Sequence, residues 1–265
     1  MNRSALMNVM TAAVRKAGRG LTRDFGEVEN LQVSRKGPAD FVSNADKRAE
    51  RTLHRELEKV RPGYGFLMEE GGEIKGTDPQ HRWIIDPLDG TTNFLHAIPL
   101  FAISVALERD GEIVAGIIYN PVSDELFSAE RGKGAYLNER RIRVAARRSL
   151  EDSVVTLGIP HLGRGDHDAW LDVQRTLMAR TQGIRRTGAA ALDLAWVAAG
   201  RFDGFVETGL SAWDIAAGII IVREAGGYVT DTRNRDVSLK TGEVVAANPE
   251  VHNELVKSLA SAGRA

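Results

Sequence analysis

The chain has 265 residues, of which 43 % are hydrophobic and 27 % charged, and its formal net charge is -1. This composition is typical of a soluble globular protein with a large core, and the balanced charge does not favour a general nucleic-acid or membrane-surface binder. The chain has no cysteine, no apolar run near the ~18 residues of a membrane span and no signal-peptide core at its N-terminus, so we expect a cytoplasmic protein without disulfides or cysteine-ligated zinc.

Two amphipathic helices, followed by a group of strands, are predicted in the first half of the chain. Hydrophobic periodicity places the first helix over residues 5–17 and indicates that it ends at Gly18 and Gly20. An Asp-Gly pair between two later apolar runs is a strong hairpin signal. The remaining predicted elements of this half are the helix 43–60 and the strands 83–86, 101–109, 112–119 and 125–129.

Strands alternate with helices in the second half, which indicates an α/β layer. The pattern changes in a dense basic segment, residues 141–151, so we divide the chain into an N-terminal α+β half, residues 1–145, fused to a C-terminal α/β half, residues 146–265. The predicted strands of the second half are 154–158, one that begins at Arg185, 202–207, 228–230 and 244–247. Its predicted helices are 167–179, 189–199, 213–224 and 249–260.

The stretch WIIDPLDGTTNF contains the first candidate functional residues. A buried strand leads into Asp86, Pro87 restrains that residue in an extended form, and Asp89 follows after the corner. Gly90 permits a turn, and Thr91 would then begin a helical turn whose free amides attract anions. Carboxylates beside an anion site suit metal-assisted phosphoryl transfer, although aspartate, proline and glycine are also common in ordinary turns.

Other acidic residues could complete such a site. Glu69 and Glu70 follow an apolar segment, and adjacent glutamates usually lie on a solvated surface. Asp46 and Asp214 each stand three residues after a serine, a spacing that favours a helix capping box. The helix that would begin near Asp214 is apolar throughout, so a carboxylate at its mouth needs a partner.

These motifs together resemble the inositol monophosphatase family. WIIDPLDGTTNFLH is similar to the first signature of the family and WDIAAGIIIVREAGG to the second, and the Glu69-Glu70 pair and the run GAAALDLAWVAAG stand in the family's order. The likeness covers nearly the whole chain and is nearest to bacterial inositol-1-monophosphatases of the extragenic-suppressor type. It implies a layered α-β-α-β-α sandwich of the inositol monophosphatase/fructose-1,6-bisphosphatase type, and a homodimer.

The resemblance implies a site for two or three Mg²⁺ ions per subunit. Oxygen ligands without a nearby cysteine or histidine favour magnesium or manganese over zinc. The implied ligands are Glu69, Asp86 and the Leu88 carbonyl for the first ion, Asp86, Asp89 and Asp214 for the second, and Glu69 with Glu70 for a weaker third. The implied catalytic residues are Glu69, Thr91 and Asp46, with Asp46 supporting Thr91 as it orients and deprotonates water.

A substrate side is also implied by the resemblance. The amides of Gly90 and Thr91 would hold the phosphate, and Lys36 would lie in a mobile loop that covers the metals. The residues that would face the alcohol part, or lie close to it, are Asp89, Arg185, Gly188, Ala189, Glu207 and Asp214. Ala189 and Ser211 depart from what several relatives carry, which leaves the leaving group open.

The implied activity is that of a magnesium-dependent phosphomonoesterase, inhibited by lithium, that hydrolyses inositol 1-phosphate or a similar small alcohol phosphate through attack of a metal-activated water. One alternative is a histidinol-phosphate or sugar-bisphosphate phosphatase of the same family. Another is an interaction protein that binds RNA or RNA polymerase. The last alternative depends on a basic run that is equally typical of a solvated face; it comprises Arg140, Arg141, Arg143, Arg147 and Arg148.

Overall fold

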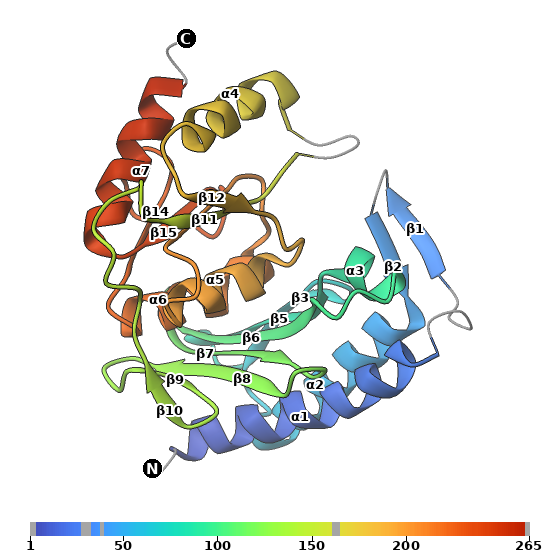
Figure 1. The fold of residues 1–265 in the computed structure, drawn as a ribbon. Helices are drawn as coiled ribbons and strands as arrows, with labels where there is room; N and C mark the ends of the chain where they lie inside the picture. Colours follow the sequence, from blue (N-terminus) through green and yellow to red (C-terminus); the bar gives the residue numbers. More distant parts are fainter. Residues whose placement is uncertain (1–3, 28–32, 38–39, 161–164, 263–265) are drawn as a thin grey trace.

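The computed structural model describes residues 4–27, 33–37, 40–160 and 165–262, and the side chains of all of these except residues 33–37 and 40–43. Helices and sheets alternate in five layers (Figure 1). Helices α1 and α2 form one outer layer, α4 and α7 form the other, and α5 and α6 lie between the two sheets. The predicted α-β-α-β-α sandwich is therefore confirmed.

The larger sheet contains eight described strands, and its neighbours are antiparallel except for β3 and β5, which are parallel. One face is covered by α1 (Ala5–Phe25) and α2 (Asn44–Val60). The strands are, in their order across the sheet, β10 (Arg140–Ile142), β9 (Ala135–Leu137), β8 (Glu125–Glu130), β7 (Glu112–Asn120), β6 (Ala102–Arg109), β5 (His81–Asp89), β3 (Gly65–Met68) and β4 (Gly72–Ile74).

The smaller sheet contains five described strands, all from the second half of the chain. Their order is β12 (Gly183–Arg185), β11 (Val154–Leu157), β13 (Gly204–Glu207), β15 (Val244–Ala247) and β14 (Tyr228–Thr230). The helices of this half are α4 (His167–Met178), α5 (Ala190–Ala198), α6 (Ala212–Glu224) and α7 (Pro249–Ala262). The hairpin of β1 (Val33–Gly37) and β2 (Asp40–Ser43) and the short helix α3 (Thr91–Leu95) complete the described elements.

Helices α5 and α6 are almost wholly apolar because they are buried on both sides. α6 packs on β5, β6, β7 and β8, and α5 packs on β13 and β15. Leu192, Ile215 and Ile221 are fully buried in this layer, as is typical of a helix that is apolar all round. Helices from the second half thus pack on strands from the first, and the division at residue 145 stays a prediction. No helix in the described part of the chain is long and apolar enough to cross a membrane.

Several predicted boundaries are wrong. Strand β5 does not end at Asp86 but continues past Pro87 to Asp89, because a register shift in its pairing with β6 accommodates the proline. Arg185 ends β12 rather than beginning a strand. Strands β3, β4, β9 and β10 have three or four residues each, and such short runs give too little periodicity to be predicted.

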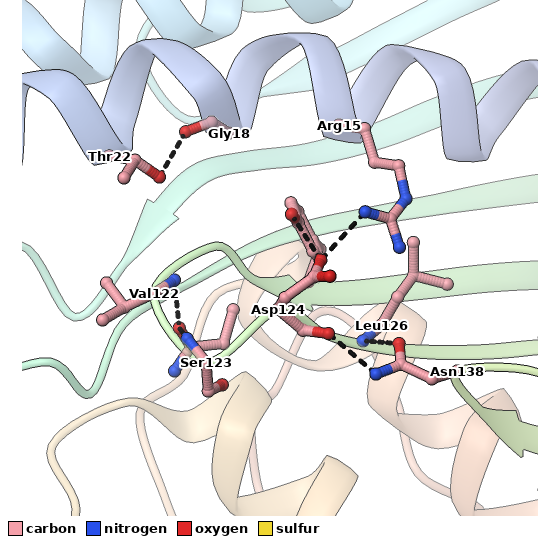
Figure 2. Close-up of polar contacts among 10 residues, drawn as sticks. Arg15, Gly18, Thr22, Val122, Ser123, Asp124, Leu126 and Asn138 are labelled. Atoms are coloured by element: carbon pink, nitrogen blue, oxygen red, sulfur yellow. Dashed lines mark hydrogen bonds and ion pairs between the residues drawn. The ribbon is translucent and has the colours of Figure 1, made fainter.

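The predicted end of the first helix at Gly18 and Gly20 is also wrong, since α1 continues to Phe25. Gly18 lies where the helix approaches the sheet most closely: a Cβ at this position would be 2.6 Å from the Tyr119 ring. The turn after β7 is held in place by Asp124, whose Oδ1 accepts hydrogen bonds from the Tyr119 hydroxyl at 2.9 Å and from Arg15 Nη1 at 2.9 Å (Figure 2). Packing against β7 therefore explains this glycine better than a helix end does.

The two glycines of α1 should respond in opposite ways to alanine. Gly18→Ala should lower the free energy of unfolding by about 1–3 kcal/mol, because its methyl group overpacks the contact with Tyr119. Gly20→Ala meets nothing within 4 Å, so it should raise that free energy by up to about 1 kcal/mol through helix propensity alone. Urea unfolding of the two variants beside wild type measures both changes; an equal gain from both would contradict the packing role of Gly18.

Candidate active site

Three carboxylates from distant parts of the sequence come together at one end of the larger sheet. Oxygen atoms of Asp86, Asp89 and Asp214 all lie within 4.8 Å of one another. Asp86 is buried and the other two are partly buried. Oxygen-only donors gathered at this separation suit a hard divalent cation such as Mg²⁺.

A local irregularity of β5 brings Asp86 and Asp89 to the same point. Side chains three residues apart in a regular strand point to opposite faces of the sheet. Here Asp86 pairs with Ser104 of β6 and Asp89 pairs with Ala102, and the register shifts between these pairs. The extra residue turns Asp89 back toward Asp86, whose Oδ1 also accepts a hydrogen bond from the Leu88 amide at 2.8 Å.

The third carboxylate, Asp214, is positioned by the start of α6. Ser104 Oγ donates to the carbonyl of Trp213 at 3.0 Å, which fixes the start of α6 against β6. Asp214 Oδ2 accepts from the amide of Ser211 at 2.7 Å, and the predicted capping box at this helix is confirmed. The matching box at Ser43 lies outside the described side chains. Asp214 therefore caps its own helix and completes the cluster.

Asp89 also caps a helix, but one to which it does not belong. Its Oδ2 accepts a hydrogen bond from the Ala191 amide at 2.7 Å, at the N-terminus of α5. The N-cap of α5 is Ala189, whose side chain cannot cap. A carboxylate at this end satisfies a free amide and complements the helix dipole, so the larger sheet and α5 are linked at the site.

The parallel pairing of β3 with β5 places Glu69 beside Asp86. Met68 is opposite Ile85 in the register, and the Glu69 amide donates to the Ile85 carbonyl at 3.2 Å. The next residue, Glu70, donates its amide to Glu50 Oε2 at 2.8 Å. Glu69 lines the cavity described below, and Glu70 is not among its lining residues.

Thr91 links the cluster to α2. Its Oγ1 lies 3.0 Å from Asp46 Oδ1 and 3.0 Å from the Leu88 carbonyl oxygen. Asp46 is buried in the first turn of α2, so a carboxylate stands behind this hydroxyl. Gly90 has a φ of 91°, and a Cβ there would be 2.9 Å from the Leu100 carbonyl oxygen. Only glycine fits this close turn into α3.

A cavity of about 490 Å³ opens over these residues. The predicted site residues that line it are Glu69, Asp86, Leu88, Asp89, Gly90, Thr91, Gly188, Ala189, Glu207 and Asp214. Asp46 lies behind Thr91 rather than in the wall. Lys36 belongs to strand β1 rather than to a loop, and its side chain lies outside the described residues.

The arginine of the cavity is Arg186 and not the predicted Arg185. Arg185 is exposed, and its Nη1 donates to the Ile184 carbonyl at 2.9 Å. Arg186 follows the end of β12 and lines the cavity. Successive residues of an extended segment point in opposite directions, and the sequence Arg-Arg gives no signal that distinguishes them.

Two acids, the buried Asp193 and the partly buried Glu207, face the substrate side of the cavity, and Asp193 is not among the predicted residues. Asp193 Oδ1 accepts from Thr187 Oγ1 at 2.8 Å, and burial raises the pKa of Asp193 to about 7. Burial, with the charges of Asp193 and Asp214, raises the pKa of Glu207 to about 8. The signal that could have identified Asp193 is its position as the single acid in the apolar run ALDLAWVAA. A carboxylate buried in such a run is costly unless it has a partner or a function.

Excess negative charge dominates the site. Burial, followed by the charges of Glu69, Asp89 and Asp214, raises the pKa of Asp86 well above its usual range. Burial and then Asp214 do the same to the pKa of Asp89. Arg186 is the only lysine or arginine among the described residues that line the cavity. A phosphate anion would be repelled here unless cations were bound as well, and the fold and site together are those of a metal-dependent phosphatase.

Comparison with known proteins agrees with this class. The profile of the inositol monophosphatase family matches residues 2–264. The inositol-1-monophosphatase of Mesorhizobium japonicum is 62 % identical over 259 residues, which cover 98 % of this chain and 97 % of that protein. The Nus factor SuhB of Escherichia coli (strain K12) is 41 % identical over 254 residues, or 96 % of this chain and 95 % of that protein.

The fold is also shared with solved structures. The crystal structure of the extragenic suppressor protein suhB from Bartonella henselae has a TM-score of 0.95 and 59 % sequence identity, and the match covers 97 % of this chain and 98 % of that one. The chain therefore belongs to the inositol monophosphatase family, and it is a phosphatase.

Proposed function

We propose that this phosphatase is magnesium-dependent and hydrolyses inositol 1-phosphate or a similarly small alcohol phosphate. The convergence of Asp86, Asp89 and Asp214 within 4.8 Å is the observation that carries the proposal. The names of relatives that are 53–62 % identical, all inositol-1-monophosphatases, support the substrate. Histidinol-phosphate and sugar-bisphosphate activities are the alternatives within the same chemistry.

The residues present fit the proposed metal ions. Asp86, Asp89 and Asp214 would hold one ion, and Asp86 with Glu69 and the Leu88 carbonyl would hold another. That carbonyl accepts from Thr91 and still has a second lone pair to offer. Bound ions would supply an activated water and neutralise charge on the phosphate and on the leaving oxygen. A third ion would need Glu70 as well as Glu69, and Glu70 is not among the residues that line the cavity.

Thr91 and Asp46 would form a short path for a proton. When Thr91 Oγ1 donates to Asp46 Oδ1, 3.0 Å away, the threonine oxygen keeps lone pairs that can accept a hydrogen bond from the attacking water. The proton lost by the water could then pass to Thr91 Oγ1 as that hydroxyl gives its own proton to Asp46. Glu69, on the cavity wall, is the second candidate base, and the amides of Gly90 and Thr91 would hold the phosphate.

The substrate side suits an alcohol with several hydroxyl groups. Glu207 and Asp193 offer acceptors there, and Gly188 and Ala189 leave room beside them. Arg186, rather than Arg185, would supply the one positive charge on this side of the cavity. A polyol can donate a hydrogen bond to each of these acids, whereas a hydrocarbon leaving group would offer them no donor.

Activity should require magnesium. Release of phosphate from myo-inositol 1-phosphate should fall to background in a chelator, return when magnesium is added in excess, and decrease with lithium, as the family resemblance implies. Phosphate release by the demetallated protein at the full rate would disprove the proposal. The same assay with histidinol phosphate, fructose 1,6-bisphosphate and an adenosine bisphosphate identifies the preferred alcohol.

A second function in transcription is proposed from one surface feature. The residues Arg140, Arg141, Arg143, Arg147 and Arg148 are exposed, and the Escherichia coli relative is named a Nus factor. We propose that this basic run binds RNA or RNA polymerase. Contacts with phosphates would make RNA binding steeply dependent on salt. Replacing Arg140 and Arg143 with glutamate reverses two of these charges and should abolish the binding. Salt-independent binding, or binding unchanged by the reversal, would contradict it.

We also propose an oligomeric state and a cellular location. The family resemblance supports a homodimer, and the absence of cysteine supports a reducing, cytoplasmic location. Analytical ultracentrifugation of the purified protein measures its oligomeric state. A species of monomer mass at micromolar concentration would contradict the proposed homodimer.

A further inference from the structure

A second cavity lies between the two outer helices α1 and α2, which run side by side along one face of the larger sheet (Figure 1). Its volume is about 520 Å³, and it shares no lining residue with the candidate active site. We call it the α1–α2 groove, and define it by Lys16, Ala17, Gly20, Leu21, Arg23, Asp24, Ala45, Arg48, Ala49, Arg51, Thr52, His54 and Arg55.

Small residues keep the groove open. Ala17 and Gly20 on α1 face Ala45 and Ala49 on α2, and all four line it. A Cβ on Gly20 would meet no atom within 4 Å, so this glycine is not there to allow close packing. A longer side chain at Gly20 would instead occupy the space that the two helices enclose.

The rim of the groove is strongly basic although the whole chain has a net charge of -1. Two acids offset part of this charge: Asp24 pairs with Arg48 at 2.7 Å and with Arg23 at 3.4 Å, and Glu56 pairs with Lys16 and Arg55. Within the described residues the cations exceed these acids by three; the cations are Lys16, Arg23, Arg48, Arg51 and Arg55.

Two of the arginines have unused hydrogen-bonding capacity. Arg48 holds Asp24 through Nη2, but its Nε is buried and has no acceptor among the residues that the structure describes. Arg51 is exposed and forms no ion pair with any described residue. The Arg48 side chain is nevertheless 41 % exposed, so the outer N–H groups of its guanidinium, like those of Arg51, can donate to an anion in the groove.

We propose that the α1–α2 groove binds a small anion that carries two or more phosphate groups. Guanidinium groups present paired donors that match phosphate oxygens, and an excess of three positive charges suits a multiply charged ligand. The volume is within the range of about 300–1,000 Å³ that small-molecule sites occupy. Its confinement to two helices favours such a compound over an extended nucleic-acid strand, whose contacts would continue along the surface.

Inorganic tripolyphosphate is the probe for this site. Calorimetric titration of the full chain in a chelator, where the candidate active site holds no cation, should give one binding site that weakens with salt. Arg51→Ala with Arg55→Ala should weaken binding by on the order of tenfold or more, since two charge-assisted contacts are lost. Arg19→Ala, on α1 but outside the groove lining, is the matched control and should bind within twofold of wild type.

Gly20→Leu distinguishes the groove itself from its charge. It leaves every arginine in place and adds a good helix former, so the fold should persist, which the melting temperature checks, while the filled groove should lose tripolyphosphate binding. Equal binding by wild type and Gly20→Leu, or by wild type and the double arginine variant, would overturn the proposal. A single-stranded RNA that binds these arginines while tripolyphosphate does not would overturn it in favour of an extended polyanion. Because no metal is present, the result is independent of the proposed catalytic function.

Discussion

Asp89→Asn should remove nearly all phosphatase activity while leaving the metal-free protein at least as stable as wild type. Loss of a residue that merely supports a metal ligand typically reduces metal affinity or activity by about 10–100-fold, and loss of a ligand itself should exceed about 100-fold. Asparagine has the size of aspartate and keeps an oxygen that can accept from the Ala191 amide, 2.7 Å from Asp89 Oδ2. The cap of α5 therefore survives the change.

The stability of this variant follows from the charge cluster. Burial and the charge of Asp214 raise the pKa of Asp89 in the metal-free fold above its value in the unfolded chain. The folded state then holds a proton that the unfolded state has released, so the free energy of unfolding falls as pH rises from the usual carboxylate range near about 4 toward neutrality. Asp89→Asn should show a smaller decline over this range, because one like charge has gone.

Melting curves in chelator and in magnesium separate this account from a plain turn role. Magnesium should raise the melting temperature of wild type, since it binds the folded state, and should raise that of Asp89→Asn much less. Asp89→Ala is the control that also removes the cap of α5, which costs about 1 kcal/mol. If Asp89→Asn lowered the chelator melting temperature and kept the full magnesium increment, Asp89 would serve the turn and not a metal.

Thr91→Ala should lower kcat by a factor on the order of 10²–10⁴, the usual contribution of a positioned proton-transfer group. The hydroxyl lies 3.0 Å from Asp46 Oδ1, and the methyl group of alanine can neither accept from water nor donate to that carboxylate. KM should change much less, because the amides of Gly90 and Thr91 remain. The assay is a full kinetic curve for phosphate release at saturating magnesium.

Two variants control this prediction. Thr91→Ser keeps the hydroxyl and should recover most of kcat, and Thr92→Ala changes the exposed neighbour on α3 and should leave kcat within a few fold of wild type. Wild-type kcat in Thr91→Ala would transfer the role of base to another group, with Glu69 the first to test.

The layer order of this fold was implied by the family resemblance, whereas single elements had to be predicted from local patterns, and several of these predictions failed. The apolar runs of α5 and α6 indicate interior helices, and the structure confirms both. Gly18 was wrongly interpreted as the end of α1. A glycine is needed there because Tyr119, a residue far along the chain, packs closely against the helix. Propensity describes a segment alone, and tertiary packing can override it.

The candidate site could also be predicted only in part, because tertiary contacts bring its residues together. Asp86 and Asp89 belong to one motif, but in a regular strand their side chains would point to opposite faces of the sheet. A register shift between them brings both side chains to the same face, and no local sequence pattern reveals that shift. Asp214 reaches them because Ser104 fixes the start of α6, a hydrogen bond between distant segments. The choice between Arg185 and Arg186 depends on where β12 ends, and boundaries are the least certain part of any prediction from sequence.

The position of the metal tests the account most directly. Manganese accepts the same oxygen ligands as magnesium and can be located in a crystal by its anomalous scattering. We predict an anomalous peak at a coordination distance of about 2.1 Å from carboxylate oxygens of Asp86, Asp89 and Asp214, and no such peak in crystals of Asp214→Asn. If the protein is active with manganese but every anomalous peak in its crystals lies away from these three carboxylates, the proposed metal site is wrong.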